Sequence, residues 1–203
     1  MTELYINSIR ILDIVHGTSV DGPGLRTSIY GAGCTHQCPG CHNPQSWDPS
    51  GGTSVSVREV AEEVLAEGLD VTFSGGDPMF QPEAFTLLAK IIRANSTHDI
   101  WCYTGYRIER LFSDPRRRAL LEQVDVLVDG PYVQSLRDLS LLFRGSANQR
   151  LVDVPATLAQ DRVVLYTPED VTYEYISKPR QAILPSSPMR ATAVSILEHS
   201  NAL

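Results

Sequence analysis

The sequence predicts an α/β protein built on a parallel sheet. Short apolar segments typical of buried strands alternate along the chain with amphipathic helical segments, and this order favours right-handed βαβ crossovers. Of the 203 residues, 42% are hydrophobic, which is enough for one domain with a sizeable core. Sheets of this kind bind ligands beyond the carboxyl ends of their strands.

The first elements flank a cysteine-rich loop. Residues 25–33, LRTSIYGAG, are expected to form a strand that leads directly into this loop. A helix is expected over residues 56–68, because apolar residues recur there at helical spacing between acidic ones and Gly68 offers a stop. Residues 69–78, LDVTFSGGDP, indicate a short buried strand that ends in a turn.

The same alternation continues to about residue 154. The further elements expected are a helix over 81–95, a strand over 98–106, short helices over 107–112 and 116–123, and a strand over 124–131. The pattern then weakens and prolines accumulate, although residues 161–168 could form another strand. We therefore predict a core over residues 1–155 and a C-terminal extension of unknown role over residues 156–203.

Charge and hydropathy argue against two classes of protein. The net charge of -7 argues against non-specific electrostatic binding of nucleic acid, which needs clustered Lys and Arg. The N-terminal segment mixes charged and polar residues with apolar ones, unlike a signal peptide, and no run of about 18 apolar residues follows. We expect a cytoplasmic protein that does not enter membranes.

Three of the four cysteines fall in one short segment. Cys34, Cys38 and Cys41 lie within eight positions, in GCTHQCPGCHNP (33–44), and no fourth cysteine is nearby. Because no export signal accompanies them, metal or redox chemistry is favoured over disulfides.

Two kinds of metal site are compatible with three clustered thiols. A structural zinc site needs four ligands, so His36, His42 or Cys102 would have to complete it. A cubane iron–sulfur cluster can instead be held by three thiolates on one tight loop, which leaves one iron open to a substrate. Cys102 is expected in mid-strand beside Trp101, where a cysteine is more often a small buried hydrophobe than a ligand.

The spacing C-x3-C-x2-C after a first strand resembles the radical S-adenosylmethionine (SAM) superfamily. More narrowly, six blocks resemble, in the same order, the activating proteins of anaerobic ribonucleoside-triphosphate reductases. These blocks are DGPGLR (21–26), GCTHQCPGCHNPQSW (33–47), FSGGDP (73–78), YTGY (103–106), DVLVDGPY (125–132) and FRGSANQRLVDV (143–154). The superfamily usually carries an aromatic residue before its last cysteine, and Gly40 in that place matches the CPGCHN of this subgroup.

The resemblance implies a partial, open (βα) barrel with a short C-terminal extension. Cys34, Cys38 and Cys41 would hold a 4Fe-4S cluster, and the open iron would chelate the amino and carboxylate groups of SAM. Gly75 and Gly76 lack side chains, so they would let the end of a strand approach the methionine moiety of SAM.

Five further residues are expected at or beside the cofactor. Asp77 would reinforce the contact with SAM or cap the next helix, and Thr104 would face SAM. Asp129 suits a turn, or a contact with the cofactor or with a cation beside it. His42 and Asn43 would shape the cysteine loop through local hydrogen bonds.

The implied activity is that of a radical SAM activase. A low-potential electron donor such as flavodoxin would reduce the cluster, and SAM would be cleaved to methionine and a 5'-deoxyadenosyl radical. The radical would take a hydrogen atom from a glycine of the large subunit of an anaerobic ribonucleoside-triphosphate reductase. Because the cofactor carries the hard step, no catalytic triad is needed. GSANQR (145–150) would line the entrance for the partner's loop, or end a helix.

Two alternatives stay open. The first is a radical SAM enzyme that acts on another glycyl radical enzyme or on a small molecule. The second, from a different class, is a non-catalytic zinc-binding module.

Overall fold

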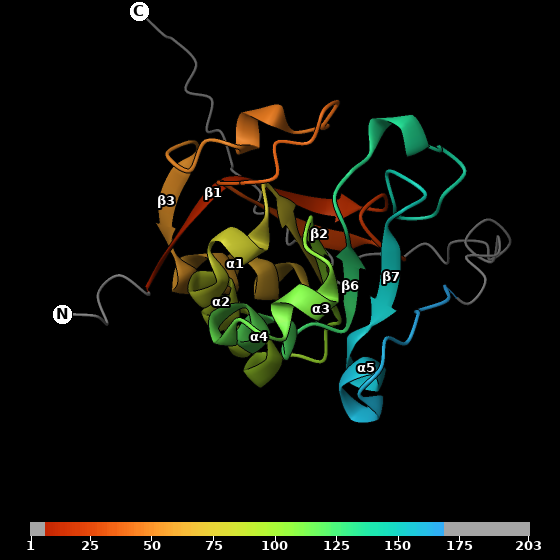
Figure 1. Ribbon diagram of the computed structural model, residues 1–203. Coiled ribbons are helices and arrows are strands. Elements are labelled where there is room, and N and C mark those ends of the chain that lie inside the picture. Colours follow the sequence, from red (N-terminus) through yellow and green to blue (C-terminus); the bar gives the residue numbers. More distant parts are fainter. Residues whose placement is uncertain (1–6, 169–203) are drawn as a thin grey trace, which may run out of the picture. The chain divides into compact units, whose positions relative to one another are not determined.

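A single mixed sheet forms the centre of the computed structural model, which describes residues 7–168 (Figure 1). The strands are β1 (Ser8–Thr18), β2 (Arg26–Gly31), β3 (Thr53–Ser56), β4 (Asp70–Gly75), β5 (Ile100–Thr104), β6 (Val126–Asp129) and β7 (Arg150–Asp153). Their order in the sheet is β3-β1-β2-β4-β5-β6-β7. The four central strands pair in parallel, as predicted. The α/β class is therefore confirmed.

The prediction that the whole sheet is parallel, however, is wrong. β1 pairs antiparallel with both β2 and β3, and β7 pairs antiparallel with β6. A hairpin connection suffices for an antiparallel neighbour, whereas each parallel pair needs a crossover. The antiparallel strands accordingly lie at the two sides of the parallel centre, where the chain enters and leaves it.

The helices are α1 (Val57–Glu67), α2 (Pro82–Asn95), α3 (Ile108–Leu111), α4 (Pro115–Leu121) and α5 (Val154–Gln160). The first four agree with the sequence-based expectation. At the start of α1, the Ser56 side chain accepts from the backbone of Arg58 at 3.2 Å, and Glu59 accepts from the Ser56 backbone at 3.3 Å. This capping box and the left-handed Gly68 at the C-cap define both ends of α1.

One face of the sheet packs against the helices. Alternate residues of the parallel strands, such as Ile29, Phe73, Cys102 and Leu127, are fully buried in this core. Cys102 is thus a buried hydrophobe, as predicted, and burial raises the pKa of its thiol well above the ordinary value. None of the helices within residues 7–168 is both long and apolar enough to cross a bilayer.

The other face of the sheet carries a smaller apolar cluster around Trp101. Val126, Val128 and Leu151 are buried beside it. The rings of Phe143 and Tyr166 pack edge-on against Trp101, each with centroids 5.4 Å apart. Together these side chains form a second apolar cluster.

The predicted division at residue 155 stays a prediction, and residues 169–203 lie outside the described part of the chain. Within the described part, α5 spans residue 155, and residues 161–168 form no strand. They contribute an isolated bridge between Leu165 and Val152 instead. Asp153 and Tyr166 add backbone hydrogen bonds that also tie this segment to β7.

Arg26 is a fully buried cation at the start of β2. Its guanidinium pairs with Asp99 and donates to Thr72 Oγ1 at 2.8 Å and to the Val71 carbonyl at 2.7 Å. It also lies 5.4 Å from the centre of the Trp101 ring. Arg26 therefore ties β2 to β4 and to the residue before β5.

Replacing Arg26 with Ala should lower the free energy of unfolding by about 3 kcal/mol, because Asp99 loses its cation and Trp101 loses a packing partner. Urea unfolding followed by circular dichroism measures this change. Arg58→Ala is the matched control, since Arg58 is exposed on α1, and should cost less than about 0.5 kcal/mol. Equal costs in the two variants would contradict the structural role of Arg26.

Candidate functional site

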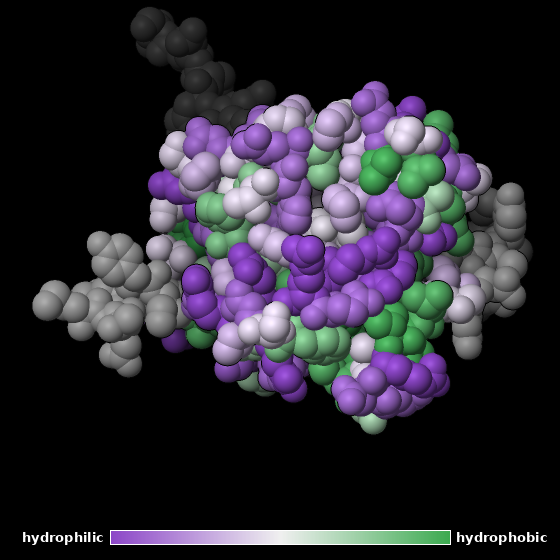
Figure 2. Space-filling view, viewed as in Figure 1, coloured by the Kyte–Doolittle hydropathy of each residue, from purple (hydrophilic) through white to green (hydrophobic). Residues whose placement is uncertain are grey.

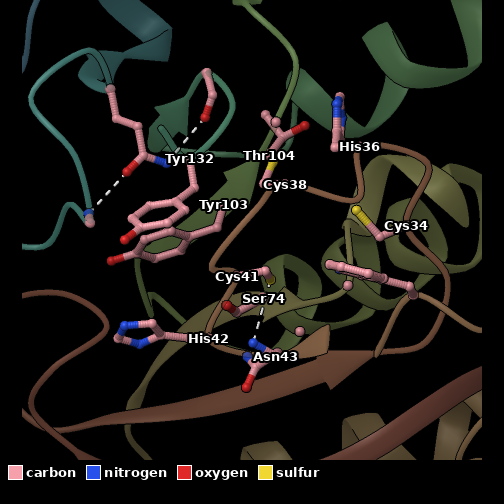
Figure 3. A pocket seen from close by; sticks show the side chains of 17 residues that line it. Cys34, His36, Cys38, Cys41, His42, Asn43, Ser74, Tyr103, Thr104 and Tyr132 are labelled. Atoms are coloured by element: carbon pink, nitrogen blue, oxygen red, sulfur yellow. Dashed lines mark hydrogen bonds between the residues drawn. The ribbon is translucent and has the colours of Figure 1, made fainter. Parts of the chain in front are cut away.

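A pocket lies at the carboxyl ends of the parallel strands, where the fold predicts a ligand (Figure 3). It is lined by Cys34, His36, Cys38, Cys41, His42, Asn43, Trp47, Ser74, Gly75, Gly76, Tyr103, Thr104, Gly105, Gly130, Tyr132, Gly145 and Gln149. These residues come from the loop after β2, the end of β4 and the turn after it, the end of β5 and the residue after it, and the loop between β6 and β7.

Eight of the ten residues predicted for the site line this pocket. They are Cys34, Cys38, Cys41, His42, Asn43, Gly75, Gly76 and Thr104. The two aspartates, Asp77 and Asp129, lie beside the pocket without lining it. The cysteine loop and three strand ends are therefore brought together, while the two carboxylates have other partners.

The cysteine loop is closed by backbone hydrogen bonds at its two ends. Gly33 donates to the carbonyl of Ser46 at 2.8 Å, and Cys34 donates to that of Trp47 at 3.2 Å. Inside the loop, the Asn43 backbone donates to Cys41 Sγ at 3.4 Å, and the Asn43 carbonyl accepts from the Ser46 hydroxyl at 2.5 Å. The three cysteines thus sit on a loop whose ends are fixed to each other.

Gly75 at the end of β4 and Gly76 after it allow the cysteine loop to lie directly on the turn that follows this strand. The Gly76 backbone donates to the carbonyl of Gly31 at 2.8 Å. A Cβ atom on Gly76 would lie 2.4 Å from the Gly33 carbonyl oxygen, and one on Gly75, at φ +100°, would lie 2.4 Å from the Gly31 nitrogen. Both positions therefore require glycine because two backbones meet, in addition to any room that a ligand needs.

Asp77 joins the turn after β4 to the end of β5. Its side chain is 3% exposed. One carboxylate oxygen accepts from the Met79 backbone at 2.9 Å, which caps the 3-10 turn over Pro78–Phe80. The other accepts from Thr104 Oγ1 at 3.0 Å and from the Gly105 backbone at 3.1 Å.

His36 is the nearest histidine to this carboxylate. Its Nε2 lies 3.0 Å from Asp77 Oδ2, but out of line for a hydrogen bond. The His36 ring packs edge-on against Tyr106, with centroids 4.5 Å apart. His36 therefore links the cysteine loop to the end of β5 by packing.

Asp129 is fully buried, and its carboxylate forms ion pairs with two arginines. It accepts from Arg107 Nη1 at 3.2 Å, from Arg150 Nε at 2.9 Å and from the Ile108 backbone at 2.9 Å. The cations beside Asp129 are thus two guanidinium groups of the same chain. They fasten α3 and β7 to the end of β6.

The donor set of the pocket suits an iron–sulfur cluster. Burial raises the pKa of the Cys34 and Cys38 thiols, so binding a cation there must release protons. Within residues 7–168, no three His, Cys, Asp or Glu side chains converge tightly enough to hold a single metal ion. The three thiols line one pocket, and soft sulfur donors favour iron–sulfur chemistry.

Several lining residues were not predicted from the sequence, among them Ser74, Tyr103 and Tyr132, whereas Gln149 belongs to the segment GSANQR (145–150) that was expected at the entrance. Gln149 Oε1 accepts from the Gly145 backbone at 2.9 Å, and Nε2 donates to the Gly130 carbonyl at 3.1 Å. It thereby joins the end of the segment between β6 and β7 to its start. Each of these residues belongs to one of the six resembling blocks, which was the available signal.

Comparisons with known proteins agree with this donor set. A family model described as "4Fe-4S single cluster domain" matches residues 20–152. Proteins named "Anaerobic ribonucleoside-triphosphate reductase-activating protein" are similar to this chain. The one from Haemophilus influenzae is 39% identical over 141 residues, covering 64% of this chain and 88% of that protein. The one from Escherichia coli K12 is 34% identical over 140 residues, covering 64% and 89%.

A relative of the same name from Enterobacteria phage T4 is 35% identical over 139 residues, covering 65% of this chain and 86% of that protein. Among solved structures, one described as "Crystal structure of QueE from Escherichia coli" aligns with a TM-score of 0.39 and 16% identity. That alignment covers 52% of this chain and 57% of the other, and its score is too low to establish a shared fold.

Replacing Gly76 with Ala should displace the cysteine loop, because the added Cβ meets backbone atoms that cannot rotate away. We expect a loss of about 2 kcal/mol in the free energy of unfolding and a lower iron and sulfide content after anaerobic reconstitution. Gly68→Ala is the control: its left-handed backbone costs about 1 kcal/mol, but nothing lies within 4 Å of the new Cβ. Normal cluster content in Gly76→Ala would refute the proposed backbone contact.

Proposed function

This chain belongs to the family of anaerobic ribonucleoside-triphosphate reductase-activating proteins, and on that premise we propose that it is a radical SAM activase that places a glycyl radical on such a reductase. One observation carries the proposal. Three cysteines on a single loop face a pocket without carboxylates at the carboxyl ends of parallel strands. The three thiols of this lining are the donors that a cluster needs, so the chemistry can rest with the cofactor.

Cys34, Cys38 and Cys41 are the proposed ligands of a 4Fe-4S cluster. Three thiolates leave one iron for the amino and carboxylate groups of SAM. When bound, the cluster and SAM supply the one-electron reductive cleavage of SAM and the hydrogen abstraction that follows. His42 and Asn43 follow the third cysteine, where they line the pocket and would hold the loop's shape around the cluster.

The carboxyl ends of the strands are the proposed binding site of SAM. Gly75 and Gly76 line the pocket with backbone atoms, which would accept hydrogen bonds from the ammonium group of SAM. Thr104 also lines it, and its hydroxyl is oriented by Asp77. We assign Asp77 and Asp129 to positioning, because hydrogen bonds and ion pairs within the chain already occupy their oxygens.

The parallel strands and their helices would act as a partial, open barrel around the cofactors. An open side suits a macromolecular substrate, since a loop of the partner could enter and complete the exclusion of water from the radical. A low-potential donor such as flavodoxin would supply the electron, and the reaction would take place in the cytoplasm.

The ligand assignment predicts that Cys34→Ala, Cys38→Ala and Cys41→Ala each abolish the cluster, because each leaves an iron without its thiolate. Wild-type protein reconstituted anaerobically should be brown and contain about four irons and four sulfides per chain. Cys102→Ala is the matched control and should retain the cluster, since Cys102 lies in the core. Tightly bound zinc with no uptake of iron would favour a zinc-binding module instead.

The activity predicts a new radical on the reductase. Anaerobic incubation of this protein with reductase, SAM and a strong reductant should give an electron paramagnetic resonance doublet. Deuteration of the partner's glycine at Cα should remove its main splitting. SAM cleavage without any radical on a glycyl radical enzyme, together with deuterium exchange into a small metabolite, would instead identify a small-molecule enzyme.

A further inference from the structure

The loop that joins β6 to β7 exposes a row of leucines. Within this β6–β7 loop (residues 130–149), Leu136 is 43% exposed, Leu139 83% and Leu142 48%. Figure 2 shows hydrophobic residues at the surface over this loop, at the upper right of the view. Single exposed leucines are common, but three within seven positions beside a reaction site indicate a contact surface.

The leucines are exposed although the loop is well ordered by its own hydrogen bonds. Leu136 donates to the Val133 carbonyl at 2.9 Å and accepts from the Ala147 backbone at 2.8 Å. At the tip, the Ser140 backbone donates to Asp138 Oδ1 at 2.8 Å. These bonds order parts of the loop backbone before a partner binds, so a partner that covers the leucines loses less conformational entropy in ordering the loop.

The base of the β6–β7 loop is also held by hydrogen bonds. The Val133 backbone donates to Ser146 Oγ at 3.2 Å, and Asn148 Nδ2 donates to the Pro131 carbonyl at 2.8 Å. Tyr103 donates its hydroxyl to the Phe143 carbonyl at 2.9 Å. The loop is therefore a rigid extension of the pocket wall.

A groove connects this loop to the cysteine pocket. Tyr132 lines the pocket and also the groove, which it shares with Pro39, Val133, Gln134 and Ser135. Pro39 lies within the cysteine loop itself. A chain bound along the β6–β7 loop would therefore reach the cysteines by passing Tyr132.

Arg137 supplies a charge beside the leucines. It is exposed, and its guanidinium forms no ion pair with any residue of the described part of the chain, although most of the other arginines there do. In a protein with a net charge of -7, an unpaired cation on an apolar surface favours a partner that offers both apolar side chains and a carboxylate.

We infer that the β6–β7 loop is the docking surface for the protein substrate: Leu136, Leu139 and Leu142 bind apolar side chains of the partner, and Arg137 pairs with one of its acidic residues. This inference rests on the proposed function, because the substrate there is a polypeptide whose reacting residue must enter the pocket. The continuity of groove and pocket places the docked segment at the entrance. Tyr132 stands between the docked segment and the cysteines.

The test is Leu139→Asp in the full-length, reconstituted protein, with the reductase as partner. We expect the concentration of reductase needed for half-maximal radical formation to rise about tenfold or more, because a charge replaces a central apolar contact. Reductive cleavage of SAM in the absence of reductase should stay at the wild-type rate. Leu139→Ser and Arg137→Glu should shift the same quantity in the same direction.

Leu165→Asp is the matched control, because Leu165 is 61% exposed on the segment after α5, away from the lining of pocket and groove. It should leave radical formation unchanged. Wild-type dependence on reductase in all three loop variants would overturn the inference. The inference would also be overturned if the wild-type protein formed a dimer that the Leu139→Asp substitution dissociates. It would be overturned, too, if residues 134–142 were protected from hydrogen exchange and deletion of residues 169–203 removed that protection. Failure of the proposed function would look different, since wild-type protein would then form no radical on the reductase.

Discussion

The site depends on a close contact between two backbones. The cysteine loop leaves β2 and lies on the turn that follows β4, where Gly76 donates to the Gly31 carbonyl at 2.8 Å and Asp77 donates to the Gly33 carbonyl at 2.9 Å. Side chains at Gly75 or Gly76 would push these segments apart. Because this contact fixes the start of the loop, it also determines where Cys34 and the cysteines after it point.

Buried carboxylates extend this arrangement to the other strand ends. Asp77 holds the turn after β4 to Thr104 at the end of β5, and Asp129 holds the end of β6 to Arg107 and Arg150. Both carboxylates accept hydrogen bonds within the chain, and the pocket is lined by thiols, two histidines, aromatic rings, hydroxyl and amide side chains, and glycines. This is the lining expected when the chain positions a cofactor and the cofactor performs the chemistry.

The parallel strands and the first four helices were predictable from the sequence. Short apolar segments typical of buried strands alternate there with segments whose apolar residues recur at helical spacing. The antiparallel strands were missed for physical reasons. β1 is interrupted by register shifts and is partly exposed, while β3 and β7 have four residues each, too few for a clear alternation. In the site, the resembling blocks identified most of the lining. The blocks could not show that Gly76 packs against the backbone of the cysteine loop, or that the Asp129 carboxylate pairs with two arginines. Nor could they show that Tyr132 lines both the groove and the pocket. All three are tertiary contacts.

In the proposed site, three thiolates hold a cluster with one iron left open for SAM. Electron-nuclear double resonance of the reduced, reconstituted protein tests it directly, using SAM labelled with 15N in its amino group and 17O in its carboxylate. We expect hyperfine coupling of both labels to the cluster, since both groups would bind the open iron. Absence of both couplings in protein that carries a full cluster and binds SAM would contradict it.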